Sequence, residues 1–459
     1  MVWAPATDDT SGSMQPVQTE AEPETRSPEE LARFRRRLSS IVAIGAIWRM
    51  GVLAVDKWHQ PLLLNDSLYY SAQARQLVNG VWFREIFVDQ PGAEHGPLTS
   101  VLLAAVSWVD DPVPWQRLLT VLCGIATIAV IGLLARRLGG ERAGLTAAGI
   151  SAVYPNLWMN DGLVMSESLS VLLVCVTLWA AHRTLGRPTV RGALVVGVVC
   201  GLAALARSEL ALLTPAIIVL LLLQTLRDRT SAQHWTRGVI VPLVVGAASL
   251  VTVLPWVAFN MARFDETVTL TTNDGTTLLG SYCDASFAGP NIGGWSLLCV
   301  VADPEYSMNE EPSVRSARQR GLAVDYAKDH VSQIPRVVAA RVGRTLDLYG
   351  LDSLVAQDVG EERYRWASWA GIVAWWAMAL LAIRGSVVLW RSTAGARWPL
   401  LLVLCPVASV VVTTVVFYGG HRIRSSMEAT VVVLAALALV KMVEMDTGLR
   451  AASAAPEGS

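Results

Sequence analysis

The sequence predicts an all-α polytopic membrane protein with about ten transmembrane helices, and three observations support this fold class. Of its 459 residues, 53% are hydrophobic and only 16% are charged, whereas soluble globular domains carry roughly a quarter charged residues. Apolar runs of about 20 residues, the length needed to cross a bilayer, recur along the chain. The polar segments between these runs differ in arginine content, as loops on the two sides of a membrane do.

The first 39 residues are polar and then basic. Residues 1–27 carry few large apolar side chains, so we expect a disordered tail. The stretch "SPEELARFRRRLSS" offers a capping box between Ser27 and Glu30, which predicts a short basic juxtamembrane helix over 28–39. This helix is expected to lie on the inner membrane surface, and a solvated linker is the alternative.

Ten segments have the length and composition expected of membrane spans. They are 40–57, 116–135, 143–160, 162–181, 190–206, 209–226, 238–258, 367–389, 398–417 and 425–443. The apolar stretch 97–109 has only about 13 residues, too few to span, and is expected to form a re-entrant or membrane-surface helix.

The arginine-rich loops predict the orientation of the chain. "RFRRR" precedes the first span, and basic loops follow the second, fourth, sixth and eighth spans. Short loops rich in Arg and Lys stay on the cytoplasmic side. All five basic segments fall inside if the N-terminus is inside, so we expect a plasma-membrane protein with cytoplasmic N- and C-termini and a cytoplasmic tail over 445–459.

Two long segments, 58–115 and 259–366, are then expected to face outward. They contain Cys283 and Cys299, whereas the other four cysteines lie in the predicted spans. Because an outward compartment permits disulfides, these two are predicted to pair. We expect 259–366 to form an extracytoplasmic loop domain that selects an acceptor, between a transmembrane module over 40–258 and C-terminal helices over 367–444.

Ionisable residues gather at the outer ends of the predicted spans. They are Asp66, Glu94, His95, Glu167, Arg207, Glu209, His421, Arg422 and Arg424. Charge in a membrane costs roughly 2.5–3.5 kcal/mol per residue on insertion scales, so it usually has a partner or a role. Carboxylates can activate a hydroxyl group, and arginines can hold a phosphate through paired donors. Each residue alone could be an ordinary interfacial group, but their common depth predicts a single site. Arg49, inside the first span, could snorkel or pair with a carboxylate such as Glu428.

These residues and their neighbours resemble the polytopic GT-C glycosyltransferases, and within them the family 39-like group of protein O-mannosyltransferases and lipid A aminoarabinose transferases. The resemblance rests on Asp66 and a tyrosine after the first span, the short helix beginning at Pro97, and the motifs "MSESL" and "GLAALARSELALL". The turn "YGGHRIRSSMEATVVVLAAL" is similar to that of actinobacterial-type members.

The resemblance implies a GT-C-like bundle and an inverting transferase that uses a polyprenyl-phosphate sugar donor on the outer face of the membrane. Its partners would be this donor, the lipid bilayer and an acceptor glycan, lipid or protein, and no nucleic acid. The implied site is listed by role: Asp66 and Glu167 catalytic; Arg207, His421, Arg422 and Arg424 at the donor phosphate; Tyr70, Glu94 and His95 at the substrate.

Two departures from the family pattern bear on metal binding and on phosphate binding. The family's first loop often carries two successive acids, but Asn65 precedes Asp66 here. No metal ligand set or cofactor is therefore predicted, and a divalent metal stays an open alternative. The family's Glu-Lys pair is replaced by Glu94 and His95, and histidine is a weaker permanent cation.

Two other classes of function fit part of the pattern: a lipid-linked sugar transporter and a non-catalytic subunit of envelope polysaccharide assembly or export. A transporter would favour broken helices near the midplane in paired halves, whereas the charges here gather at the outer end. The sequence leaves the sugar and the acceptor open.

Overall fold

The computed structural model describes residues 28–227, 232–392 and 397–453, and these residues are almost entirely helical. The only β pairing within them is an isolated bridge between Arg84 and Pro91. The predicted tail over 1–27 lies outside the described residues. The all-α fold class is confirmed.

The elements follow one another in two long helical groups separated by a series of short helices. The first group is α1 (Pro28–Val52) with a π-helical turn (Leu53–Lys57), α2 (Asp66–Val78), α3 (Pro97–Ala104), α4 (Val113–Val153), α5 (Pro155–Trp158), α6 (Glu167–Gly186), α7 (Val190–Ala206), a 3₁₀ turn (Ser208–Leu212), α8 (Leu213–Arg227) and α9 (Ala232–Met261). The short helices are α10 (Asn273–Ser281), α11 (Asp284–Phe287), α12 (Leu297–Val301), α13 (Pro312–Asp329), α14 (Ile334–Thr345) and α15 (Leu351–Gly360), with 3₁₀ turns at Gly289–Asn291 and Val331–Gln333. The last group is α16 (Arg365–Ser392), α17 (Arg397–Val403), α18 (Cys405–Val416) and α19 (His421–Ser453).

Seven of the described helices are long and apolar enough to cross a membrane, or eight if the bent pair α17–α18 forms one span. The sequence predicts about ten spans, and two features account for the difference. Helix α7 is apolar but has only 17 residues. Helix α4 has 41 residues and contains the predicted span 116–135 and most of the predicted span 143–160.

Helix α4 folds back on itself at a glycine pair. Gly139 and Gly140 leave the helical conformation, and Gly140 has a φ of 79°, which favours glycine. A Cβ added at Gly132 would lie 3.2 Å from the Cβ of Ala148, although sixteen residues of straight helix would separate them by about 24 Å. The segments on either side of the glycine pair therefore pack against each other as a hairpin.

Three terminal or short helices differ in extent from the prediction. Residues 28–39 do not form a separate surface helix, because they are the first turns of α1, where Phe34 and Leu38 pack against α4. Residues 445–453, predicted as tail, continue α19. The apolar stretch after Gly96 gives the eight-residue α3, which packs through Leu103 against α2.

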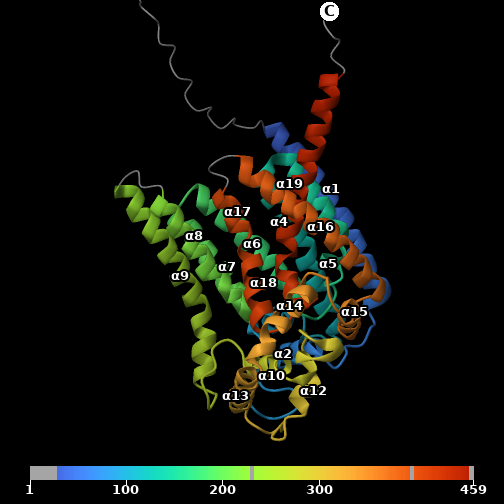
Figure 1. Ribbon diagram of the computed structural model, residues 1–459, viewed down its shortest axis with the longest axis vertical. Helices are drawn as coiled ribbons and strands as arrows, with labels where there is room; N and C mark the ends of the chain where they lie inside the picture. The colour runs from blue at the N-terminus through green and yellow to red at the C-terminus, as the bar shows by residue number, and fades with distance from the viewer. Residues whose placement is uncertain (1–27, 228–231, 393–396, 454–459) are drawn as a thin grey trace, which may run out of the picture.

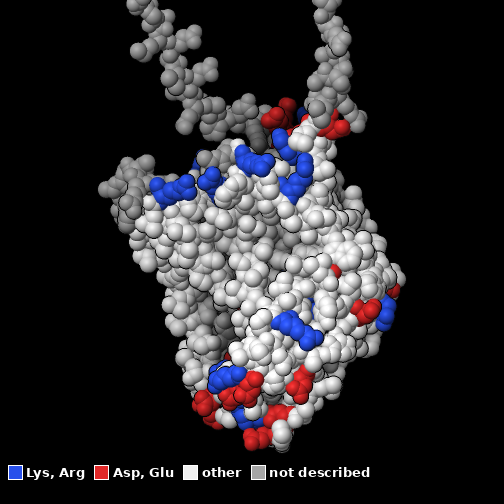
Figure 2. Space-filling model, in the orientation of Figure 1, with Lys and Arg blue, Asp and Glu red and all other residues white. Residues whose placement is uncertain are grey.

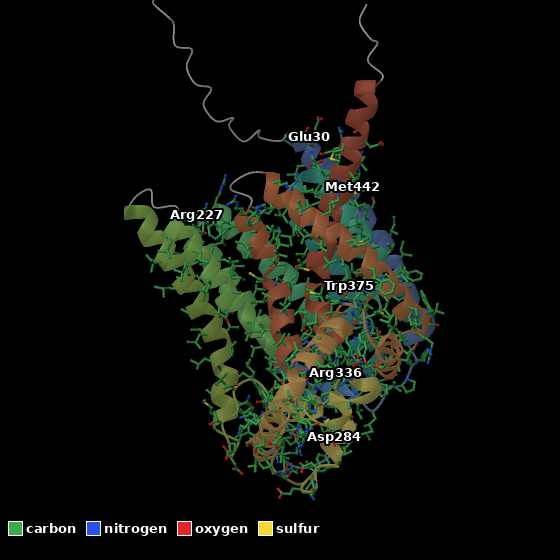
Figure 3. All side chains as sticks on the ribbon, viewed as in Figure 1. Glu30, Arg227, Asp284, Arg336, Trp375 and Met442 are labelled. Atoms are coloured by element: carbon green, nitrogen blue, oxygen red, sulfur yellow. A yellow bond between two sulfur atoms is a disulfide. The ribbon has the colours of Figure 1, made fainter. Side chains whose placement is uncertain are left out.

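Charges and helices distribute along the long axis of the molecule. Figure 1 places α2, α10, α12 and α13 at the end opposite the C-terminus. Lys and Arg, with a few Asp and Glu, gather near one end of the molecule, a nearly uncharged band follows, and both signs of charge cover the other end (Figure 2). In Figure 3, Arg227 lies at the first end, Trp375 in the middle and Asp284 at the far end.

The main core lies where α4, α6, α7, α8 and α19 meet. Arg49 of α1 is buried beside this bundle, and its Nε lies 2.6 Å from Asp161 Oδ2. Its other donors reach the carbonyl oxygens of Ser151 and Ala152. The sequence suggested Glu428 as a partner, but Glu428 binds Arg424 and Tyr154 instead.

The short helices α10, α12 and α13 at the far end belong to the segment between α9 and α16. Cys283 and Cys299 are joined by a disulfide there, which links the N-terminus of α11 to α12.

Candidate active site

A cavity of about 400 Å³ lies where α2, α7 and α19 meet the segment before and including α10. Its charged or aromatic lining residues are Asp66, Tyr70, Glu94, His95, Arg207, Glu209, Asp274, Phe417, Tyr418 and Arg422. Six of the nine residues to which the resemblance gave a role therefore share this cavity, although they come from four separate parts of the chain. Apolar side chains, Leu212, Val412, Val416 and Ile423, line another part of it.

Asp66 is presented to the cavity by the first turn of α2. Asn65 is the N-cap of this helix, and its side-chain oxygen accepts a hydrogen bond of 2.9 Å from Ser67 N, which fixes the start of the helix. Asp66 Oδ2 lies 2.7 Å from Arg422 Nη2, and Oδ1 lies 3.5 Å from His95 Nε2. Burial raises the pKa of Asp66, but the charges of Arg422 and His95 outweigh burial and hold it well below its usual range.

Glu167 lies behind two arginines and does not line the cavity. Its side chain is 1% exposed, and its Oε1 lies 2.7 Å from Arg422 Nε and 3.1 Å from Arg207 Nη1. Arg207 also pairs with Glu209 at 2.5 Å. Because each guanidinium is fixed by a carboxylate, the two cations are held near each other despite their like charge.

The loop before α3 brings Glu94 and His95 to the same cavity. The backbone N–H of Glu94 donates to Tyr69 Oη at 3.0 Å, and the His95 ring stacks on Tyr70 with 5.0 Å between centroids. Burial and the charge of Asp66 raise the pKa of Glu94 against the opposing effect of His95. Burial lowers the pKa of His95, but Asp66 and Glu94 outweigh burial and raise it.

His421 and Arg424 do not line the cavity, although the sequence grouped them with Arg422. His421 lies between two carboxylates, with Nε2 2.7 Å from Asp347 and Nδ1 2.7 Å from Asp358. Arg424 is 1% exposed and pairs with Asp347 at 2.5 Å and with Glu428 at 2.7 Å. Both residues belong to a buried ionic network between α19 and the segment over 347–358.

Sequence reasoning missed the residues that support Arg422 from the end of the segment over 259–366. Glu361 Oε1 lies 3.6 Å from Arg422 Nη1, and Arg363 pairs with Glu361 and, at 3.2 Å, with Asp358. Tyr418 lines the cavity beside them. The charge-dense stretch "GEERYR" just before α16 was a visible signal, but nothing in it indicates which helix end it contacts.

No group of three or more His, Cys, Asp or Glu side chains is arranged to hold a metal ion within the described ranges.

Comparisons with known proteins bear on the family and on the fold. Residues 94–259 match the family model described as dolichyl-phosphate-mannose-protein mannosyltransferase, and this segment includes Glu94, His95, Glu167 and Arg207. No curated protein matches the chain in sequence.

Among solved structures, the apo oligosaccharyltransferase of Archaeoglobus fulgidus superposes with a TM-score of 0.58 at 14% identity, covering 94% of this chain and 53% of that one. The oligosaccharyltransferase AglB of the same organism, in complex with an inhibitory peptide and a dolichol-phosphate, gives 0.55 at 15% identity with the same coverage. The chain spans about half the length of these proteins. At such identities the likeness shows the fold, so the GT-C-like bundle predicted from the sequence is confirmed.

Proposed function

We propose that this protein is an inverting membrane glycosyltransferase that moves a sugar from a polyprenyl-phosphate donor to an acceptor hydroxyl on the outer face of the membrane. One observation carries the proposal: a carboxylate, Asp66, and two arginines, Arg207 and Arg422, meet in a cavity that also has an apolar wall. The family match over 94–259 supports the same class of donor.

The arrangement suits a lipid-linked phosphate. Arg207 and Arg422 carry guanidinium donors that match phosphate geometry. The apolar lining by Leu212, Val412 and Val416 suits the first isoprene units of a lipid chain. The donor phosphate would thus replace carboxylates as a partner of the two arginines.

That exchange prepares Asp66 to act as the base. When Arg422 turns from Asp66 to the phosphate, the carboxylate loses the cation that most lowers its pKa, so its proton affinity rises. The acceptor oxygen then attacks the anomeric carbon while its proton passes to Asp66. The bond between the anomeric carbon and the phosphate oxygen breaks, and its electron pair leaves with polyprenyl phosphate, which the arginines stabilise. Glu167 positions these arginines, because it touches both of them and does not line the cavity.

The proposed orientation places the termini in the cytoplasm, the module over 40–258 and the helices over 367–444 in the membrane, and the segment over 259–366 outside. Exposed positions at opposite ends test it. Cysteine at Arg142 or Arg187 should be shielded from an impermeant thiol reagent in intact cells, whereas cysteine at Ser307 should react. Labelling at Arg142 and Arg187 together with protection at Ser307 would reverse the orientation.

A transfer assay tests the activity. Purified protein in lipid nanodiscs is given a panel of polyprenyl-phosphate sugars and envelope-derived acceptors, and sugar transfer and release of polyprenyl phosphate are measured together. Transfer that an Asp66→Asn variant lacks supports the proposal. Movement of lipid-linked sugar across a vesicle membrane without any transfer would indicate a transporter instead.

A further inference from the structure

One wall of the cavity remains without a role in the proposed reaction. It comes from α10 and the residue pair before it, and consists of Thr271, Asn273, Asp274 and Thr277. These side chains offer hydroxyl, amide and carboxylate groups, which can both donate and accept hydrogen bonds.

Helix α10 has two different faces. On one face it is anchored to α13: Thr276 Oγ1 donates to Gln319 Oε1 at 2.8 Å, and Gly275 N donates to Ser316 Oγ at 3.1 Å. On the other face Asn273 and Thr277, which are four residues apart and so neighbours on the helix surface, line the cavity. Within the described part of the chain, neither of these two side chains has a hydrogen-bond partner.

Helix α10 packs closely against its neighbours. A Cβ at Gly275 would lie 2.0 Å from the carbonyl oxygen of Ser316, and one at Gly280 would lie 2.2 Å from Trp295 Nε1. Asp274 is fixed as well, since its Oδ1 accepts 2.8 Å from Ser316 Oγ and its Oδ2 lies 2.9 Å from Arg320 Nη2. The polar wall is therefore held in place before any ligand arrives, which lowers the entropic cost of binding.

The size of the cavity decides what this wall can contact. At about 400 Å³ it is at the small end of ligand pockets. A donor whose phosphate lies on Arg207 and Arg422, and whose lipid follows the apolar lining, has its sugar in the remaining polar part. An uncharged amide and a hydroxyl suit sugar hydroxyls, and neither adds the positive charge that a second phosphate would require.

We infer that Asn273 and Thr277 bind the hydroxyl groups of the donor sugar and so determine which sugar the protein accepts. This inference rests on the proposed function and assigns the sugar subsite of the same cavity to α10. Asp274 supports the wall through α13 and is a positioning residue.

Binding measurements on the full chain in nanodiscs test the subsite. The probes are one polyprenyl phosphate without sugar and the same lipid carrying mannose or arabinose. The wild-type protein should bind at least one conjugate more tightly than the bare phosphate. Asn273→Ala and Thr277→Val should each weaken binding of that conjugate about three- to tenfold and leave binding of the bare phosphate unchanged.

Three controls separate recognition from folding. Thr277→Ser keeps the hydroxyl group and should bind as the wild type does. Asn309→Ala removes an exposed asparagine side chain of the same outer segment and should change neither affinity. Thermal unfolding of each variant should match the wild type.

The failures of the two proposals are distinguishable. If Asn273→Ala and Thr277→Val bind every conjugate as the wild type does while Arg207→Ala loses the bare phosphate, the subsite is overturned and the proposed function stands. Equal wild-type affinity for bare and conjugated lipid would also overturn the subsite. If the wild type binds no polyprenyl phosphate at all, both proposals fail.

Discussion

Two arginines in the first turn of α19 form ion pairs with carboxylates, and the two pairs differ in how exposed they are. Arg422 lies in a cavity with Asp66, and these side chains are 17% and 25% exposed. Arg424, two residues later, is 1% exposed and paired with an Asp347 that is fully buried. Both are arginines bound to carboxylates, but only the first pair is accessible to a ligand.

The contrast shows that two ion pairs of the same chemistry, two residues apart on one helix, can serve different purposes. A pair at the wall of a cavity can exchange partners with an incoming phosphate. A pair sealed in the protein has already lost its hydration, so removing one partner leaves an uncompensated buried charge. Changes to the open pair, Arg422 with Asp66, are therefore expected to affect function. Changes to the closed pair, Arg424 with Asp347, are expected to affect stability.

The largest expected effect is on turnover, and it comes from changing Asp66, the carboxylate of the open pair. Asp66→Asn should lower the turnover number about 10²–10⁴-fold, because the base is lost, while affinity for polyprenyl phosphate is not weakened. Turnover and lipid binding are measured on the same purified protein. A stable Asp66→Asn protein with full activity would exclude Asp66 as the base.

Removing Arg424, the cation of the closed pair, should mainly destabilise the fold. Arg424→Ala leaves Asp347 and Glu428 without their cation, a change that costs about 3–5 kcal/mol in comparable buried pairs. Thermal and denaturant unfolding of purified protein measure this loss. If Arg424→Ala is as stable as the wild type but loses donor binding, the division between the two regions is wrong.

Removing Arg422, the cation of the open pair, should mainly weaken donor binding. Arg422→Ala removes a charge-assisted contact, so affinity for polyprenyl phosphate should fall about ten- to a hundredfold. Arg422→Lys keeps the charge without the paired donors and should recover part of the affinity. The matched comparison is Arg424→Lys, for which donor affinity should stay at the wild-type level.

The smallest expected effect is a dependence of donor affinity on pH. It arises at His95, which faces Asp66, Glu94 and Arg422. Its pKa is raised above the ordinary value of 6.5, so its charge is present below that pH and is lost as pH rises through the raised pKa. Glu94, whose pKa is raised above its ordinary 4.5 by burial, gains negative charge as pH rises through that raised pKa. Both changes disfavour a phosphate, so donor affinity should fall severalfold as pH rises above about 6.5.

A lysine at this position provides the control. His95→Lys keeps its positive charge across this range, so the pH dependence of donor affinity should flatten. An unchanged pH profile in His95→Lys would assign the effect to another group.

Composition and periodicity determined the fold class of this protein. Apolar runs of sufficient length must cross a bilayer as helices, because no water there satisfies the backbone. Charges that interrupt such runs are costly, which is why Asp66, Glu167, Arg207 and Arg422 could be picked out without a structure. Cys283 and Cys299 could be paired in the same way, as the two cysteines outside the predicted spans.

Only the tertiary structure decided what each charge faces. Successive helical residues turn by about 100°, so Arg422 and Arg424 point in different directions, and the sequence motif that contains both could not tell which one lines a cavity. Helix ends also meet groups that are distant in the chain: Asp347 for Arg424, Glu361 for Arg422 and Asp161 for Arg49. These pairings depend on how the helices and the segment over 259–366 pack, because a side chain's partner is fixed by the three-dimensional position of its helix and not by its own local sequence.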